Sequence, residues 1–387
     1  MIYFDNAATT SPKPRQVVQA VSNTLLTQSA NPGRSGHAVS EAAAVTVYDT
    51  RQKAAALFNA PSAESVIFTL NCTSSINYVL KGILRPQDRV MTSSLEHNAV
   101  VRPLTALQAH GISYDVFEAD LSDKDVTLRS FINSVRPGTR LVICTHASNV
   151  TGTALPIGEI GKFCRANGIL FAVDAAQSAG VLDIDMQRDC IDYLCIAPHK
   201  GLYAPMGTGM LIIAGQPLMT LFEGGTGTES VNLNQPADMP ERYESGTVNL
   251  PGIAGIGAGI DFVKSKGIDK IRAHETRILQ RIYRNLSGIS GIRLYTPMPD
   301  SGNAPVLSFN LKDENSVTVA NALNERGIAV RAGLHCAPFA HKRLGTISSG
   351  TVRIAPSAFT SEKDADILTD AVRAIARGAK STFKRNI

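Results

Sequence analysis

The chain has 387 residues, of which 44% are hydrophobic and 18% charged, and its formal net charge is +5 at pH 7. This is the composition of an ordinary globular protein, and a small, dispersed positive charge does not favour nucleic acid as a partner. No run of about 18 apolar residues predicts a membrane span, and the N-terminal residues do not resemble a signal peptide. The six cysteines are scattered without a C-x-x-C pair, so we expect reduced thiols, no metal site and a cytoplasmic location.

Short apolar runs alternate with helical patterns between residues 66 and 213. Strands are expected at residues 66–68, 90–92, 113–117, 141–144, 170–173, 193–196 and 210–213. This alternation predicts an α/β domain with a mostly parallel sheet. Ligands of such sheets gather at the carboxyl ends of the strands, and Asn149, Asp174 and His199 each follow a predicted strand closely. We therefore expect these three side chains to converge.

The pattern changes after a glycine-rich segment at residues 251–259. We interpret this segment as a helix with small packing residues, not a dinucleotide loop, because no strand precedes it and Pro251 suits a helix start. Beyond it we expect a long amphipathic helix over 268–286, strands near 305–309, 329–331 and 351–354, and a last helix that opens at Ser361. The chain is therefore expected to form a large domain over residues 15–260 and a smaller α+β domain from residues 1–14 and 261–387.

Lys200 and Asp174 are the residues with the most distinctive chemistry. Lys200 follows His199 between two apolar runs, where an imine-forming lysine is a good candidate. Asp174 follows a predicted strand and precedes Gln177, and a carboxylate there suits a protonated pyridine nitrogen. A lone lysine would be an ordinary solvated residue, but the pair indicates pyridoxal 5'-phosphate as the cofactor.

Three further features would complete a site for this cofactor and an amino-acid substrate. Residues 71–75 open a helix after a strand and would bind phosphate through hydroxyls and backbone N–H groups. His97, in a polar turn, would stack on the ring, and Arg353, on a late strand, would bind a carboxylate through two bonds. Each feature alone has an ordinary explanation. Residues 71–75 would be a plain helix cap, His97 a solvated histidine and Arg353 part of a surface ion pair. The joint occurrence of the three features is what favours the site.

Motifs along the whole chain carry a specific resemblance. They are YFDNAATT at 3–10, NPGRSGH at 31–37, SNVTG at 148–152, the Asp174/Gln177 segment, His199-Lys200, ESGTVN at 244–249 and RAGLHCA at 331–337. In this order they resemble the cysteine desulfurases, which belong to the class V aminotransferases among the fold-type I pyridoxal-phosphate enzymes, in the branch with a short cysteine loop. The resemblance implies an aspartate-aminotransferase-like large domain and a smaller α+β C-terminal domain.

The resemblance also implies the cofactor contacts. Lys200 would carry the imine and later move protons, and Asp174 would hold the pyridine nitrogen. The other contacts would be Gln177 at the phenolic oxygen, His97 on the ring face, and Thr73 and His199 at the phosphate, with Cys72 beside Thr73 among the cofactor-binding residues. Thr247 would reach the phosphate of the other subunit's cofactor, which implies a homodimer. Ala197 stands where many members have serine or threonine, so one phosphate ligand is missing.

For the substrate, the resemblance implies that Asn149 and Arg353 bind the carboxylate, with Arg331 as the next candidate. Cys336 would be the nucleophile that takes sulfur as a persulfide. The sequence supports a reactive thiol there, because Gly333 and Pro338 predict a loop and basic residues follow up to residue 343. The other five cysteines lie in or beside apolar runs and are expected in the interior.

These features predict an enzyme that converts L-cysteine to L-alanine and passes the sulfur from Cys336 to an acceptor protein or thiol. Three alternatives stay open at this point. The first is a selenocysteine lyase, and the second is a transaminase or β-lyase in which Cys336 is a spectator. The third is a non-catalytic protein that keeps the fold, which an absorption band that shifts on adding an amino acid would exclude.

Overall fold

A seven-stranded sheet forms the centre of the protein, with the strand order β2-β8-β7-β6-β5-β3-β4. The computed structural model describes residues 1–300, 302–312 and 314–378. The strands are β2 (Val66–Thr69), β3 (Arg89–Ser93), β4 (Ser113–Phe117), β5 (Thr139–Thr145), β6 (Leu170–Asp174), β7 (Tyr193–Ile196) and β8 (Gly209–Ile213). The strands from β7 to β4 pair in parallel, whereas β8 is antiparallel to both β2 and β7. The predicted α/β class with a mostly parallel sheet is confirmed.

Helices cover both faces of this sheet because its strands are apolar on both faces. On β5, Val142 and Cys144 contribute to one core, and Leu141 and Ile143 contribute to the other, as a period of two requires. The first core also contains side chains of α2 (Ala38–Phe58), α5 (Lys124–Ser134), α6 (Ile157–Ala166) and α7 (Leu250–Lys266). The second contains those of α3 (Cys72–Ile83) and α4 (Asn98–Leu107).

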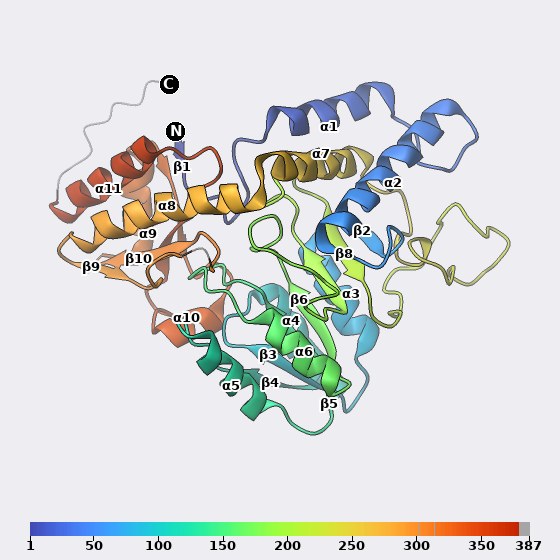
Figure 1. The fold of residues 1–387 in the computed structure, drawn as a ribbon, viewed down its shortest axis with the longest axis horizontal. Helices are drawn as coiled ribbons and strands as arrows, with labels where there is room; N and C mark the ends of the chain where they lie inside the picture. The colour runs from blue at the N-terminus through green and yellow to red at the C-terminus, as the bar shows by residue number, and fades with distance from the viewer. Residues whose placement is uncertain (301, 313, 379–387) are drawn as a thin grey trace.

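Helix α7 is the helix predicted from the glycine-rich segment. It packs against α2 and against α1 (Arg15–Thr27), and Figure 1 shows the three helices together at the top of the molecule. Gly259 explains one of the glycines, because a Cβ there would lie 2.0 Å from the carbonyl oxygen of Leu202. The small residues therefore allow this helix to pack closely on the loop that follows β7.

The C-terminal third forms a second layer at the left of Figure 1. A four-stranded antiparallel sheet has the order β12-β13-β10-β9, and β11 pairs in parallel with β1 at the N-terminus. The elements are β1 (Ile2–Tyr3), α8 (Ile268–Ser287), β9 (Ile292–Leu294), β10 (Leu307–Leu311), α9 (Ser316–Asn324), β11 (Ile328–Ala329), β12 (Arg331–Gly333), α10 (Pro338–Leu344), β13 (Thr351–Ile354) and α11 (Glu362–Ala376). Helix α11 begins with the capping box of Ser361 and Asp364.

A separate core lies between α8, α11 and this sheet, and it includes Phe4 from the N-terminus. The separate core indicates a second structural unit in the C-terminal third. Its bounds, residues 1–14 and 261–387 beside a large domain over 15–260, stay a proposal. In the part of the chain that the structure describes, no helix has both the length and the apolar character needed to cross a membrane.

The register of the central sheet brings the candidate residues together. Asp174, the last residue of β6, pairs with Thr145 of β5 on one side and Cys195 of β7 on the other. The turns that follow β3, β5 and β7 carry His97, Asn149 and Lys200. The predicted convergence at the carboxyl ends of the strands is therefore observed.

Candidate active site

Lys200 lies in the turn after β7 and is partly buried. Burial lowers the pKa of its amine. Nearby Asp174 and Cys72 oppose this shift, and the positive charges of Arg353 and Arg331 add to it. A lowered pKa leaves more of the amine in the neutral, nucleophilic form that imine formation requires.

The N-terminal motif holds the Lys200 turn in place. The carbonyl of His199 accepts hydrogen bonds from the backbone and the hydroxyl of Thr10, each at 3.1 Å, and from the ammonium group of Lys13 at 2.8 Å. The Thr10 hydroxyl also bonds to the carbonyl of Lys200 at 3.2 Å. Burial, with the charges of Lys200 and Lys13, lowers the pKa of His199 to about 4, so its ring is neutral near pH 7.

Asp174 is 3% exposed and points one oxygen at protein donors. Its Oδ1 accepts the N–H of Ala176 at 2.9 Å and the thiol of Cys72 at 3.5 Å. Burial, together with the charge of Asp174, raises the pKa of Cys72, so the thiol stays protonated and can donate this bond. Within the described residues no hydrogen bond engages Oδ2, which leaves this oxygen for a ligand. Cys72 therefore contacts Asp174 directly, in addition to its place in the segment 71–75 that is expected to bind phosphate.

Thr73 is exposed in the first turn of α3. The side chain of Asn71 caps this helix by accepting the N–H of Ser74 at 2.9 Å. The backbone N–H groups of Cys72 and Thr73 make no hydrogen bond within the described residues. Free N–H groups at a helix N-terminus suit an anion such as phosphate.

His97 is the N-cap residue of α4, and its Nδ1 accepts the N–H of Ala99 at 3.0 Å. Burial lowers the pKa of His97; Asp174 opposes this shift and Lys200 adds to it. The neutral ring then carries its hydrogen on Nε2, because Nδ1 acts as an acceptor. Its predicted stacking on a cofactor ring stays a prediction.

Cys336 is exposed in the loop between β12 and α10. His335 and Cys336 have φ angles of 48° and 56°, a left-handed conformation that costs about 1–2 kcal/mol for each non-glycine residue. Two hydrogen bonds stabilise it: Asn98 donates its N–H to the Cys336 carbonyl at 2.7 Å, and Asn149 Nδ2 donates to the His335 carbonyl at 2.7 Å. The loop is thereby tied to the turns that follow β3 and β5.

Four of the other cysteines are buried as expected: Cys72, Cys144, Cys164 and Cys195. The expectation of an interior position is wrong for Cys190, which is only partly buried. Cys190 ends a tight turn with a φ of 52°, and its N–H bonds to the carbonyl of Gln187. This turn places the residue at the surface although the sequence beside it is apolar.

Arg353 is 1% exposed, so a surface ion pair does not describe it. Its Nη2 lies 2.8 Å from Oδ1 of Asp5, and its Nη1 donates to the carbonyl of Asn149 at 3.1 Å. Arg331 lies directly opposite on the neighbouring strand and is half-buried. Sequence reasoning missed the part of Asp5, although this residue stands in the N-terminal motif.

Gln177 lines one small cavity together with Lys200, whereas Thr247 lies elsewhere. Gln177 is buried, and its Nε2 donates to the carbonyl of Ala7 at 2.9 Å. Thr247 is exposed and lines a hollow of about 570 Å³ together with Ser74 of α3. No hydrogen bond joins Thr247 to the Lys200 turn among the residues that the structure describes.

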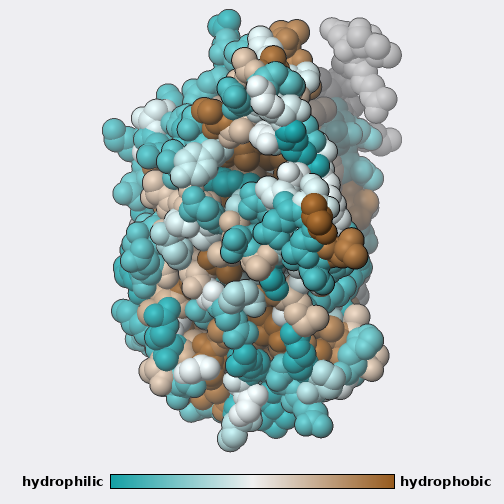
Figure 2. Space-filling model, turned by 90° about the vertical axis from the view of Figure 1, so that its right-hand side faces the viewer, coloured by the Kyte–Doolittle hydropathy of each residue, from teal (hydrophilic) through white to brown (hydrophobic). Residues whose placement is uncertain are grey.

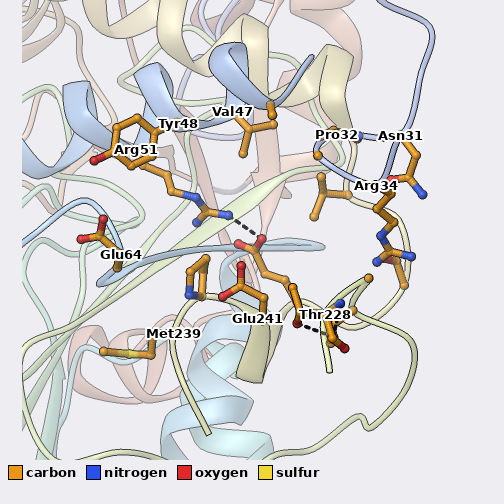
Figure 3. A pocket seen from close by; sticks show the side chains of 18 residues that line it. Asn31, Pro32, Arg34, Val47, Tyr48, Arg51, Glu64, Thr228, Met239 and Glu241 are labelled. Atoms are coloured by element: carbon orange, nitrogen blue, oxygen red, sulfur yellow. Dashed lines mark hydrogen bonds and ion pairs between the residues drawn. The ribbon is translucent and has the colours of Figure 1, made fainter. Parts of the chain in front are cut away.

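The loop that carries Thr247 borders a second cavity of about 440 Å³, and arginine side chains on two sides of this cavity bond to the loop. Arg51, on α2, forms an ion pair with Glu244. Figure 3 shows Arg51 and Arg34 on opposite sides of the cavity. Glu244 also accepts the N–H of Phe68 at 2.6 Å, and Arg34 donates to the carbonyls of Gly225 and Gly246. Burial raises the pKa of Glu244, whereas Arg51 lowers it. The 31–37 and 244–249 motifs are thus structurally joined.

The residues around Lys200 fit a polar, anionic cofactor. Asn149 Oδ1, His199 Nδ1 and Arg353 Nε are buried and have no hydrogen-bond partner in the described part of the chain. Buried polar atoms are normally paired, so orphaned atoms near one partly buried lysine indicate a ligand site. Together with the unpaired oxygen of Asp174, they match the needs of pyridoxal phosphate.

Comparisons with known proteins agree with this geometry. Residues 2–368 match the model of the family Aminotransferase class-V. A probable cysteine desulfurase of Methanothermobacter thermautotrophicus is 33% identical over 97% of this chain and 94% of its own length. A cysteine desulfurase of Dickeya dadantii is 33% identical over 90% of this chain and 86% of its own.

The fold comparison gives the same result. The apo structure of a cysteine desulfurase from Thermococcus onnurineus NA1 superposes with a TM-score of 0.90 at 30% identity, over 97% of this chain and 95% of that one. A cysteine desulfurase structure from Escherichia coli gives a TM-score of 0.85 at 27% identity, over 97% and 94% of the two chains. The chain therefore belongs to the class V aminotransferases and, among them, to the cysteine desulfurases.

Proposed function

We propose that this enzyme converts L-cysteine to L-alanine, holds the sulfur as a persulfide on Cys336, and binds pyridoxal 5'-phosphate covalently at Lys200. The observation that carries the proposal is the anchoring of the Cys336 loop. Its two hydrogen bonds reach the turns after β3 and β5, at the same end of the sheet as Lys200 and Asp174. A thiol held there would be within reach of a substrate bound at the lysine.

Each residue at this end of the sheet has a role that its contacts support. When bound, the cofactor supplies an electron sink for deprotonation at the substrate Cα. Asp174 Oδ2 would hold the ring nitrogen in its protonated form, and Lys200 would move the proton. The Cys336 thiolate would attack the substrate sulfur, so that an S–S bond forms as the C–S bond breaks, and the released carbon would take up a proton.

Binding of the substrate carboxylate is assigned to Arg353 and Asn149, with Arg331 beside them. Arg353 has an unpartnered Nε, and its charge is already balanced by Asp5. Asn149 Nδ2 carries two hydrogens, so one would meet the carboxylate while the other keeps its bond to the His335 carbonyl. Asn149 would thus connect the bound substrate to the Cys336 loop.

The phosphate would lie at the first turn of α3, where the N–H groups of Cys72 and Thr73 are free, and near the neutral ring of His199. Gln177 would contact the phenolic oxygen by turning from Ala7. The phosphate residues would thus come from the turns after β2 and β7, and Gln177 from the turn after β6.

We also propose a homodimer in which Thr247 reaches the phosphate of the other subunit. The hollow that Thr247 lines also exposes Leu70 (70% exposed) and Phe222 (58%). The adjoining loop over residues 223–236 exposes Val231 (96%) and Leu233 (100%). Apolar side chains gathered in this way mark an interaction surface. Figure 2 faces the side of the molecule where this segment lies and shows apolar surface among the polar side chains. A second copy of the chain would cover it.

The partner in sulfur transfer would be an acceptor protein or a small thiol, since Cys336 is exposed to both. We propose a cytoplasmic setting, because the six cysteines are free thiols and a reducing compartment keeps thiols in this form.

The experiment that tests the proposal is an absorption spectrum of the protein with pyridoxal 5'-phosphate, recorded before and after adding cysteine. The wild type should show a visible imine band that shifts with the amino acid, and it should then release alanine. Lys200→Ala should lose the band. Lys13→Ala is the matched control, because Lys13 is a second partly buried lysine beside the same turn, and it should keep the band. An imine band that persists in Lys200→Ala would refute the assignment.

A further inference from the structure

Glu96 is a buried carboxyl group that has no part in the roles described above. It is 0% exposed and directly precedes His97. Its Oε1 and Oε2 both accept the N–H of Thr145, at 2.9 and 3.1 Å, and Oε1 also accepts the hydroxyl of Ser93. The side chain therefore joins the turn after β3 to the last residue of β5.

The turn that Glu96 anchors touches three parts of the site. His97 is the next residue along the chain. Asn98 donates its N–H to the Cys336 carbonyl at 2.7 Å. Thr145, to which Glu96 is bonded, pairs in register with Asp174. The Glu96 side chain thus fixes the relative positions of His97, the Cys336 loop and the end of β6 at Asp174.

The charge state of Glu96 suits a supporting role. Burial raises its pKa to about 8, the bonds from Ser93 and Thr145 oppose this shift, and Asp174 adds to it. The raised pKa makes the neutral form more accessible near pH 7 than it is for an exposed glutamate. A neutral carboxyl can hold the turn without competing with Asp174 for a positively charged ring nitrogen.

We propose that Glu96 is a positioning residue, which holds residues 96–98 so that His97 lies over the cofactor ring and the Cys336 loop keeps its place. The inference deepens the proposed function and rests on it in one respect, the binding of pyridoxal 5'-phosphate at Lys200.

The first test is a double-mutant cycle on the dissociation constant of pyridoxal 5'-phosphate, measured by titration of the cofactor-free protein. Glu96→Ala and His97→Ala should each weaken binding by about two- to tenfold, the contribution expected of one stacked ring. The double variant should be no weaker than His97→Ala alone, because Glu96 acts through His97. Glu96→Gln, which keeps the shape and one acceptor oxygen without a charge, should bind nearly as the wild type does.

The second test uses the cysteine loop and does not need turnover. Alkylation of Cys336 by iodoacetamide, followed by peptide mass spectrometry, should be faster in Glu96→Ala than in the wild type, because the Asn98 bond to Cys336 loosens. His97→Asn should leave the rate unchanged, because asparagine removes the ring but keeps a side-chain oxygen that caps α4 at Ala99. Glu96→Asp keeps the carboxyl but shortens the side chain, so it should also speed the alkylation of Cys336. It replaces Glu96→Ala in this test if the alanine variant does not fold.

Asp189→Ala is the matched control for loss of a buried carboxyl group. Asp189 is 5% exposed and precedes β7, at the opposite end of the sheet from Asp174. This control should lower stability without changing cofactor affinity or Cys336 alkylation. Additive losses in the Glu96/His97 cycle, or wild-type behaviour of both Glu96→Ala and Glu96→Asp, would overturn the inference. If the wild type itself did not bind the cofactor, the proposed function would fail, and the alkylation rates would still decide the part of the inference that concerns Cys336.

Discussion

Replacing Arg353 by lysine should strongly weaken the binding of any amino-acid substrate. The three side-chain nitrogen atoms of Arg353 differ in their partners. Nη2 bonds to Asp5, Nη1 bonds to the Asn149 carbonyl, and Nε has no partner among the described residues. Lysine has a single nitrogen, which cannot serve Asp5, Asn149 and a carboxylate together. A hydrogen bond to a charged group contributes about 1.5–3 kcal/mol. Loss of one such bond to the substrate therefore predicts a KM about 10- to 150-fold higher.

The assay is steady-state alanine formation from cysteine over a wide range of cysteine concentrations. Arg331→Lys is the comparison variant, because Arg331 lies opposite Arg353 in register but is less buried. Its effect on KM should be clearly smaller. A KM unchanged in Arg353→Lys and sharply raised in Arg331→Lys would refute the reasoning and move the carboxylate site to Arg331.

Three further predictions concern the carboxyl groups of Asp174 and Glu275, which are buried, and of Asp5, which is partly buried. Asp174→Asn should retain the cofactor but lower kcat about a thousandfold, because an amide cannot stabilise a protonated ring nitrogen; near-normal turnover would contradict this role. Asp5→Asn should lower the free energy of unfolding in urea by about 3 kcal/mol, because Arg353 stays buried without its charged partner; a loss below about 1 kcal/mol would show that the ion pair does not stabilise the fold. Glu275, buried on α8, accepts the Tyr203 hydroxyl at 3.3 Å, and burial raises its pKa from 4.5 to about 8. The native state then keeps a proton that the unfolded state loses, so Glu275 by itself contributes a downward slope to stability as pH rises from about 4.5 to 8. Glu275→Gln should reduce this slope, and parallel stability curves for the two proteins would argue against the shift.

The sequence predicted the central sheet well because its strands are apolar on both faces. The expected strands 113–117 and 193–196 agree with β4 and β7 residue for residue. Asp174 and Lys200 were found for the same reason, since a polar residue that directly follows a buried run stands out. The capping residue Ser361 was likewise visible, because a cap acts through neighbours in sequence.

The contacts that complete the site were not predictable in this way. Asp5 and Arg353 are 348 positions apart in sequence, and no local pattern links them. Glu96 binds the backbone N–H of Thr145, a donor that almost every residue has, so nothing in the sequence singles out its partner. The left-handed conformation of Cys336 is also invisible in sequence, because bonds from Asn98 and Asn149 impose it.

The central claim is that Cys336 receives the sulfur, and measuring cyanide-labile sulfur on the protein after incubation with cysteine tests it most directly. Cys336→Ala should bind pyridoxal 5'-phosphate as the wild type does, because Cys336 makes none of the contacts assigned to the cofactor. The wild type should carry labile sulfur on Cys336 while alanine appears, and the variant should carry none and form almost no alanine. Release of alanine and sulfide by Cys336→Ala at close to the wild-type rate would contradict the account.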